Sequence, residues 1–286
     1  MIRVRRPLKW LLGGACCAIV VTLLAAYVLG SAFISSANRP VTMPADFATP
    51  LVIPGEGRAI AASLRDLGGD TPVVLLLHGM RGDRRSTLPR ARRLVAAGFS
   101  VLLIDQQGHG ETPGEHITFG WRESADVHAA LGWLRAKLPG RAIGVIGVSL
   151  GGAAFLLQAD PVHVDALVLE AVHPDLRRAT RNRAGRLMTP LLLAQIEPRL
   201  GVSVAQLDPV RHIADVATPV LIVGGELDAD TTAADTRLLF DAARPPKELW
   251  IVPRAAHEDF SKVDPDGYDA HVVAFLRRHL VHAGDR

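Results

Sequence analysis

The sequence predicts an α/β protein with a doubly wound, mostly parallel sheet, a short helical cap and one N-terminal transmembrane helix. Three observations lead to this fold class. From residue 51 onward, short continuously apolar runs alternate with segments of helical periodicity, which is typical of parallel strands buried on both faces. This alternation breaks once, over residues 172–215. An uncharged apolar stretch that is long enough to cross a bilayer precedes the α/β pattern.

The N-terminal 38 residues carry the whole positive excess of the chain. They contain Arg3, Arg5, Arg6 and Lys9 and no acidic residue, which leaves 28 basic against 29 acidic residues in the rest of the chain. The net charge of +3 is therefore not a property of the predicted α/β domain. Because no cluster of basic and aromatic side chains appears either, nucleic acid is not expected as a partner.

Residues 10–33 are expected to form a transmembrane signal anchor behind a basic cytoplasmic segment, residues 1–9. At about 1.5 Å per residue the stretch spans the roughly 30 Å hydrocarbon core of a bilayer. The positive-inside rule then leaves the N-terminus in the cytoplasm and the rest of the chain outside it. The alternative is a signal peptide cleaved beside the small residues at 30–32 or 35–37, which would give a secreted protein.

Beyond this stretch we expect a linker over 34–50, rich in Ser, Pro and small side chains, and the α/β domain over 51–286. The predicted strands are 73–77, 101–105, 143–149, 166–171, 220–224 and 249–252. The predicted helices are 87–97, 124–138, 151–158, 233–243 and 268–280. An antiparallel edge hairpin is expected over 51–65, with its turn at 54–57.

Residues 172–215 are long enough to form a short helical cap between two strands of the sheet. Their first part is rich in arginine, their middle is apolar, and two prolines follow. We interpret the arginines as a solvated helix face. They are Arg177, Arg178, Arg181, Arg183 and Arg186.

The strongest local signal is the motif Gly-Val-Ser-Leu-Gly-Gly at 147–152. It follows a predicted strand and opens a predicted helix, which is the context of a nucleophile elbow. The serine backbone is strained in such a turn and neighbouring segments approach closely, so glycines flank it. The pattern predicts that Ser149 is a nucleophile at the carboxyl end of the sheet.

A nucleophilic serine needs a general base, and the base needs an orienting carboxylate. Both should follow later strands, the acid before the histidine. Asp228 follows the predicted strand 220–224, and His257 follows the predicted strand 249–252. These two residues are therefore the predicted partners of Ser149.

Other residues near these strand ends remain open as alternatives. Asp230 is the competing acid, whereas Glu226 is disfavoured because it lies nearer to its strand. His173 follows another strand and is expected either to line the pocket or to belong to the cap loop.

Two backbone N–H groups are expected to stabilise the oxyanion of a tetrahedral intermediate. One belongs to Leu150, directly after the predicted nucleophile, and the other to Met80 in the loop after the strand 73–77. His78 in that loop is interpreted as a bracing residue rather than a catalyst, and His109 as structural.

Together these motifs resemble the α/β-hydrolase superfamily, specifically its serine aminopeptidase-like or hydrolase-like group. The matching segments are His-Gly-Met-Arg at 78–81, Asp-Gln-Gln-Gly-His-Gly-Glu-Thr at 105–112, the elbow motif at 147–152, Gly-Glu-Leu-Asp at 225–228 and Ala-Ala-His at 255–257. The resemblance implies the α/β-hydrolase fold, with Ser149, Asp228 and His257 as nucleophile, acid and base. It also implies Met80 and Leu150 as oxyanion donors. The cap matches least, so the resemblance indicates little about the substrate.

The sequence therefore predicts a membrane-anchored serine hydrolase that cleaves a carboxylic ester or related acyl bond. Its substrate is expected to be a small acyl compound, and the membrane tether favours lipid-derived ones. No metal or organic cofactor is expected, and both cysteines lie in the apolar stretch. The alternatives are a peptidase or amidase of the same fold and a non-catalytic binding protein of that fold.

Overall fold

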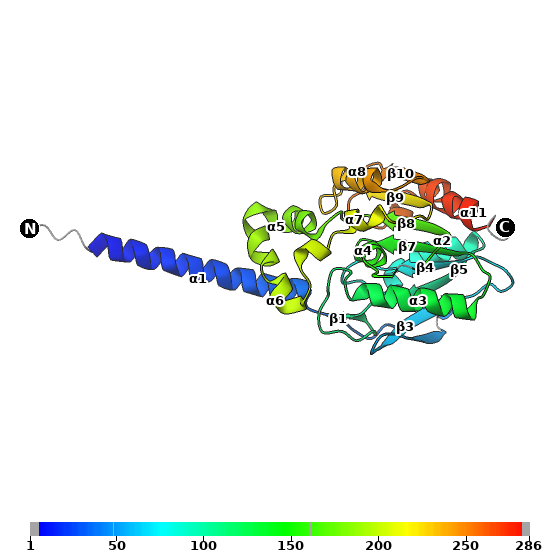
Figure 1. Cartoon of the computed structure of the whole chain (residues 1–286), viewed down its shortest axis with the longest axis horizontal. Helices are drawn as coiled ribbons and strands as arrows, with labels where there is room; N and C mark the ends of the chain where they lie inside the picture. The colour runs from blue at the N-terminus through cyan, green and yellow to red at the C-terminus, as the bar shows by residue number, and fades with distance from the viewer. Residues whose placement is uncertain (1–5, 48, 161, 282–286) are drawn as a thin grey trace, which may run out of the picture.

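One sheet of eight strands organises the molecule, in the order β10-β9-β8-β7-β4-β5-β3-β2 (Figure 1). This computed structural model describes residues 6–47, 49–160 and 162–281. The strands are β2 (Pro50–Pro54), β3 (Ala59–Arg65), β4 (Val73–Leu77), β5 (Ser100–Ile104), β7 (Ile143–Val148), β8 (Ala166–Glu170), β9 (Val220–Gly225) and β10 (Lys247–Val252). Neighbours from β10 to β5 are parallel, and β2 and β3 run antiparallel at one edge. The predicted sheet and its predicted edge hairpin are both confirmed.

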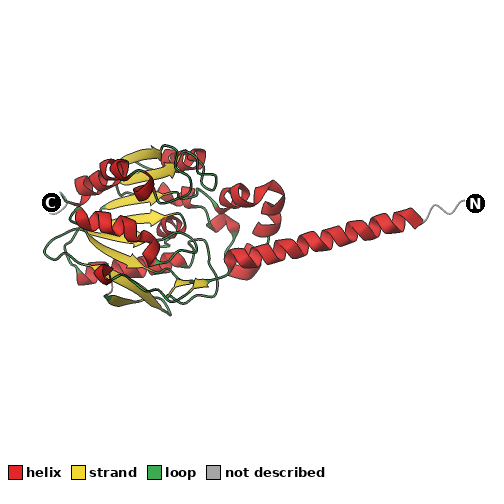
Figure 2. Cartoon of the chain, turned by 180° about the vertical axis from the view of Figure 1, so that it is seen from behind, coloured by secondary structure: helices red, strands yellow, loops and turns green. Residues whose placement is uncertain are grey.

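Helices cover both faces of the sheet (Figure 2). The first face carries α3 (Glu123–Lys137), α4 (Leu150–Leu156), α7 (Pro209–Ile213) and α8 (Ala233–Ala242). The second face carries α2 (Leu88–Ala96), α9 (Phe260–Val263), α10 (Pro265–Tyr268) and α11 (Ala274–Leu280). The helix predicted over 268–280 is confirmed, and it contains a π-helical turn at Asp269–Val273 that joins α10 to α11 without a break.

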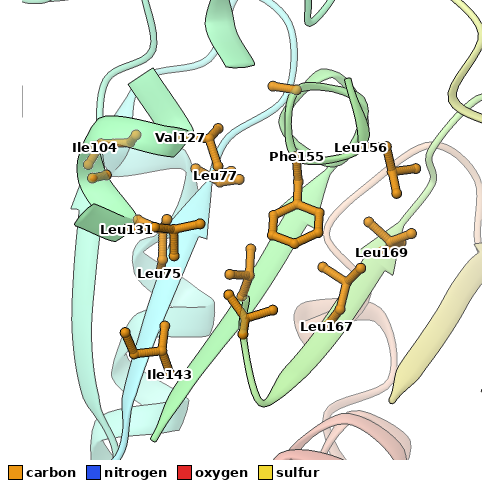
Figure 3. Close-up of a cluster of buried hydrophobic side chains, with 14 of the residues drawn as sticks. Leu75, Leu77, Ile104, Val127, Leu131, Ile143, Phe155, Leu156, Leu167 and Leu169 are labelled. Atoms are coloured by element: carbon orange, nitrogen blue, oxygen red, sulfur yellow. The ribbon is translucent and has the colours of Figure 1, made fainter. Parts of the chain in front are cut away.

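The apolar runs of the strands serve both faces because successive side chains point to opposite sides of a sheet. Leu75 and Leu77 of β4 pack with Leu131 and Phe155 in the first core cluster (Figure 3). Leu76, which lies between them in sequence, belongs to the cluster on the other face. The carboxyl ends of the parallel strands all point to the same side of the molecule, and the candidate site lies there.

The segment predicted as a cap is helical. It contains α5 (Leu176–Leu193), α6 (Ile196–Leu200), a 3-10 turn at Val204–Gln206 and α7. Gly185 interrupts α5 with φ 74° and ψ 170°, a conformation outside the helical region that glycine adopts without a steric penalty. The cap is therefore a bent helix followed by short turns.

The N-terminal helix α1 (Arg6–Ile34) projects away from the body (Figures 1 and 2). Its segment Trp10–Ile34 contains an 18-residue window with a mean hydropathy of 2.3 and is long enough to cross a membrane. However, its C-terminal turns contact the cap, and Ala26 and Ile34 are buried. The membrane span over 10–33 stays a prediction, and the last turns of this helix also pack on the folded body.

Residues 34–50, predicted as a linker, also lie against the body. β1 (Ala37–Asn38) pairs in parallel with β6 (His109–Gly110). A 3-10 turn at Ala45–Phe47 follows, and the Phe47 side chain is buried in the second core cluster. The Ser- and Pro-rich composition reflects irregular backbone rather than freedom from the domain.

Candidate active site

Ser149 lies in a sharp turn between β7 and α4. Its φ of 49° and ψ of −112° are unusual for a residue with a side chain, and such strain is typical of functional turns. The flanking positions must be glycine because a side chain there would collide with neighbouring backbone. A Cβ at Gly147 would lie 2.5 Å from Gly152 Cα, and one at Gly151 would lie 2.7 Å from the Leu77 carbonyl oxygen. The turn thus has the geometry that the elbow motif predicted.

Asp228 and His257 meet at the ends of β9 and β10. His257 Nδ1 lies 2.7 Å from Asp228 Oδ2, while Asp228 Oδ1 accepts hydrogen bonds of 2.8 Å from the backbone N–H groups of Asp230 and Thr231. The carboxylate is buried, and 27% of the His257 side chain is exposed. A carboxylate at Nδ1 orients the imidazole and leaves Nε2 as the nitrogen that can accept a proton.

The competing acids have other partners. Asp230 Oδ2 lies 3.1 Å from Arg183 Nε, and Glu226 Oε2 accepts a 2.8 Å hydrogen bond from the Arg254 backbone N–H. Of these carboxylates, Asp228 is the one that contacts His257.

A pocket of about 420 Å³ brings Met80, Ser149 and His257 into one wall, with Asp228 held behind His257. Leu150 is the first residue of α4, so its N–H has no acceptor within the helix. The loop that contains Met80 passes directly beside the elbow, since a Cβ at Gly79 would lie 3.5 Å from Ser149 Cβ. The structure therefore brings all five predicted site residues together at the carboxyl ends of the parallel strands.

His78 braces the loop that carries Met80. Its Nδ1 donates to the Gly79 carbonyl oxygen at 2.8 Å, and its Nε2 accepts from the Gln106 N–H at 3.1 Å. Burial, with a smaller contribution from His109, lowers the pKa of His78 to about 3, so the ring is neutral at physiological pH. These bonds confirm the predicted bracing role.

His173 is buried beside the site but does not belong to the described pocket wall. Burial lowers its pKa to about 4, and the charges of Arg183 and His257 act in the same direction. Its Nε2 is buried without a hydrogen-bond partner among the residues that the structure describes. Of its two predicted roles, pocket lining and membership of the cap loop, His173 therefore has the second.

One cap arginine differs from its prediction. Arg183 is not on a solvated face, because only 24% of its side chain is exposed, and it lines the pocket while paired with Asp230. Its helical neighbours Arg181 and Arg186 are exposed, as predicted. Tertiary contact, rather than local sequence, separates this arginine from the others.

A buried polar cluster next to the pocket was not predicted. Arg90 Nε and Nη2 donate to Glu170 Oε2 at 2.9 and 2.6 Å, and Arg90 Nη1 lies 2.9 Å from Asp259 Oδ1. Tyr268 donates to Glu170 Oε1 at 2.6 Å. Burial, and then the Glu170 carboxylate, raises the pKa of Tyr268 well above its usual range, so the phenol keeps its proton.

This cluster connects the elbow to the loop of His257. The Glu170 carbonyl oxygen accepts a 2.8 Å hydrogen bond from the Ser149 N–H, and Asp259 lies two residues after His257. Arg90 and Asp259 also line the pocket. A sequence signal did exist, because Glu170 ends an apolar buried strand, and a carboxylate in that position needs a partner.

Comparison with known proteins adds to this geometry. The family model described as "Serine aminopeptidase, S33" matches residues 70–207. The uncharacterized protein Rv2307c of Mycobacterium tuberculosis is 32% identical over 200 residues, which are 69% of this chain and 66% of that protein. The chain thus covers slightly less than two thirds of this relative.

The most informative solved structure is an esterase, Pf2001 of Pyrococcus furiosus. It superposes with a TM-score of 0.69 at 21% identity and covers 86% of this chain and 99% of its own. An esterase from Exiguobacterium antarcticum has a TM-score of 0.60 at 15% identity, over 79% of this chain and 98% of its own. At these identities the likeness concerns the fold.

Proposed function

We propose that this chain is a serine hydrolase of the α/β-hydrolase superfamily that cleaves carboxylic esters or related acyl bonds. The observation that carries the proposal is the 2.7 Å contact between His257 Nδ1 and Asp228 Oδ2 at a pocket that also contains Ser149 on its strained turn. A Ser-His-Asp set with this order and placement supports nucleophilic acyl transfer.

In the proposed reaction, Ser149 Oγ attacks the carbonyl carbon and its proton passes to His257 Nε2. The N–H groups of Met80 and Leu150 stabilise the oxyanion. Collapse of the intermediate breaks the bond to the alcohol, which leaves with the proton from His257. Water then attacks the acyl-enzyme and gives a proton to His257, and the second collapse releases the acid and returns the proton to Ser149.

Fluorophosphonate labelling of membranes that contain the full chain tests this proposal. Wild type should be labelled, and Ser149→Ala should not. Ser86→Ala provides the matched comparison, because Ser86 lines the same pocket but donates its hydroxyl proton to the Asp83 carbonyl oxygen at 2.7 Å. Labelling that disappears in Ser86→Ala but persists in Ser149→Ala would overturn the assignment of the nucleophile.

An amidase or aminopeptidase is the second candidate, favoured by the description of the matching family model. The pocket wall includes three carboxylates: Asp230 and Asp259 are paired with Arg183 and Arg90, whereas exposed Glu258 accepts a 3.0 Å hydrogen bond from the Ala256 backbone N–H. Glu258 is therefore a carboxylate that could hold a substrate amine, whereas the likeness to solved esterases favours ester cleavage. Rates on p-nitrophenyl esters and on aminoacyl anilides, measured with the same preparation, separate the two candidates.

We also propose that α1 is an uncleaved signal anchor, with the N-terminus in the cytoplasm and the hydrolase outside it. The basic residues before Trp10 and the length of the apolar helix support this topology. The full-length chain should resist extraction from membranes by carbonate. A soluble product shortened near residue 32 or 37 would instead indicate a cleaved signal peptide.

A further inference from the structure

The cap is fixed to α1 by polar contacts at the last turns of the helix. Gln195 Nε2 donates to the Ala26 carbonyl oxygen at 3.0 Å, and Arg199 Nη2 donates to Ser31 Oγ at 2.9 Å. The Arg199 guanidinium also lies 5.0 Å from the centre of the Tyr27 ring. The distance between the cap and the membrane-spanning part of α1 is therefore set by the structure.

The free part of α1 is too short to span a bilayer by itself. From Trp10, just after the last basic residue, to the residue before Ala26 there are about 16 residues, or about 24 Å of helix. The hydrocarbon core is about 30 Å thick, and tilt would shorten the reach further. Val28 and Leu29 still expose 56% and 53% of their surface, so the apolar side of α1 continues past the first cap contact. A membrane that encloses this apolar surface must reach the level of the cap.

The cap presents an apolar surface at that level. Leu187 is 88% exposed, more than any other large apolar side chain in the described body outside α1. Pro190 and Ala194 are also exposed and Leu191 is half-buried, and the spacing of these four residues puts them on one face of α5. Gln195 joins this face to α1, since its Nε2 also lies 3.0 Å from the Leu191 carbonyl oxygen.

We propose that the cap face formed by Leu187, Pro190, Leu191 and Ala194 rests in the interfacial region of the lipid bilayer beside α1. Figures 1 and 2 show α5 on the side of the body from which α1 projects. Exposed Arg186 is next to Leu187 and can pair with lipid phosphates. The occupant of the apolar face is thus the bilayer that already surrounds α1.

This arrangement specifies the substrate class of the proposed hydrolase. Arg183, in the wall of the pocket, lies four residues before Leu187 on the same bent helix. The cap wall of the pocket therefore lies next to the membrane surface, and the substrates are long-chain acyl esters that partition into the bilayer. The inference rests on the proposed anchor and the proposed hydrolase activity.

Fluorescence of a single labelled cysteine tests the position of the cap. The full chain, with Cys16→Ser and Cys17→Ser, receives one cysteine at Leu24, Leu187 or Leu67, is labelled with a nitrobenzoxadiazole dye and is reconstituted into phosphatidylcholine–phosphatidylglycerol vesicles. Leu67 is the control, because Arg65 pairs with Val101 at the opposite end of β5 from the cap.

We expect strong quenching by spin-labelled lipids when the dye is at Leu24 and no quenching when it is at Leu67. At Leu187 the dye should be quenched by lipids that carry the spin label at headgroup depth. An aqueous signal at Leu187 with lipid quenching at Leu24 would overturn the cap proposal and leave the anchor intact. An aqueous signal at Leu24 would overturn both. Fluorophosphonate labelling of the same vesicles reports the hydrolase activity separately.

The substrate class is tested by Leu187→Glu in the same vesicles. We expect a roughly tenfold loss on a long-chain acyl ester dissolved in the bilayer and an unchanged rate on water-soluble p-nitrophenyl acetate. Val52→Glu is the matched control, because Val52 is 62% exposed on the edge strand β2, and it should change neither rate. Equal rates for Leu187→Glu and wild type on both esters would overturn the proposed delivery from the bilayer.

Discussion

The sheet side and the cap side of the pocket are built differently. On the sheet side, Arg90 and Glu170 are almost fully buried and joined by hydrogen bonds of 2.6 to 2.9 Å. On the cap side, α5 bends at Gly185, and the pocket residue Arg183 is partly exposed. The difference indicates that the sheet side of the pocket is held by buried ion pairs, whereas the cap side is a thin, partly exposed layer.

The largest effect should come from Asp228, the proposed catalytic acid on the sheet side. Asp228→Asn removes the charge that orients His257, and we expect kcat on an activated ester to fall about 10⁴-fold. Asp230→Asn instead removes the partner of Arg183 on the cap side and should lower kcat far less. Steady-state kinetics on both variants measures the contrast. Similar losses in the two variants would contradict the placement of Asp228 as the acid.

Next in size is the loss of the buried arginine. Arg90→Met leaves Glu170 and Asp259 without their cation, and we expect the free energy of unfolding to fall by about 3–5 kcal/mol. Arg92→Met on the same helix is the control, since Arg92 and its partner Asp46 are both exposed and should contribute under about 1 kcal/mol. Urea unfolding in detergent tests this, and equal changes in the two variants would argue against a structural role for the buried cluster.

A smaller change is expected from the elbow. A Cβ at Gly152 would collide with Val172 Cγ2, so Gly152→Ala should destabilise the protein by about 1–3 kcal/mol. Gly132→Ala in α3 has open space around it and should stabilise the protein by about 0.5–1 kcal/mol. Thermal unfolding of both variants compares them, and a stable Gly152→Ala would show that the elbow can relax.

The smallest effect concerns His173, at the junction between sheet and cap. Because the folded-state pKa is about 4 and the usual value is 6.5, the unfolded chain gains a proton that the folded protein does not as pH falls between these values. Between pH 7 and 5.5, wild type should therefore lose about 1 kcal/mol of stability relative to His173→Phe. Urea unfolding at both pH values measures the difference. If the difference in unfolding free energy between wild type and His173→Phe does not change with pH, His173 is not held neutral.

Much of the sheet could be predicted because the local sequence of each strand is a recognisable apolar run. An apolar run such as Val73–Leu77 is buried on both faces whatever its neighbours are, so its position follows from hydrophobicity alone. The turn at Ser149 was equally local, because flanking glycines are needed wherever a strand enters a helix this sharply. The helix predicted over 268–280 is present, but its π-helical turn at Asp269–Val273 could not be predicted because it leaves the spacing of apolar residues unchanged.

The candidate site was predictable only in part. Order along the chain and position after a strand selected Asp228 and His257, but Asp230 satisfies nearly the same criteria and differs by two residues. The buried Arg90–Glu170 pair joins residues 80 positions apart, and no local pattern connects them. Likewise, one arginine of α5 faces the pocket while its neighbours face solvent.

The sequence by itself determined the parallel sheet, the strained serine turn and the apolar N-terminal helix, because each depends on interactions among residues close in the chain. Only the tertiary structure decided which carboxylate contacts His257, which charges meet beneath the pocket, and that the end of α1 packs on the cap. Those outcomes depend on how distant backbone segments are placed, and an ångström of displacement is enough to exchange one hydrogen-bond partner for another.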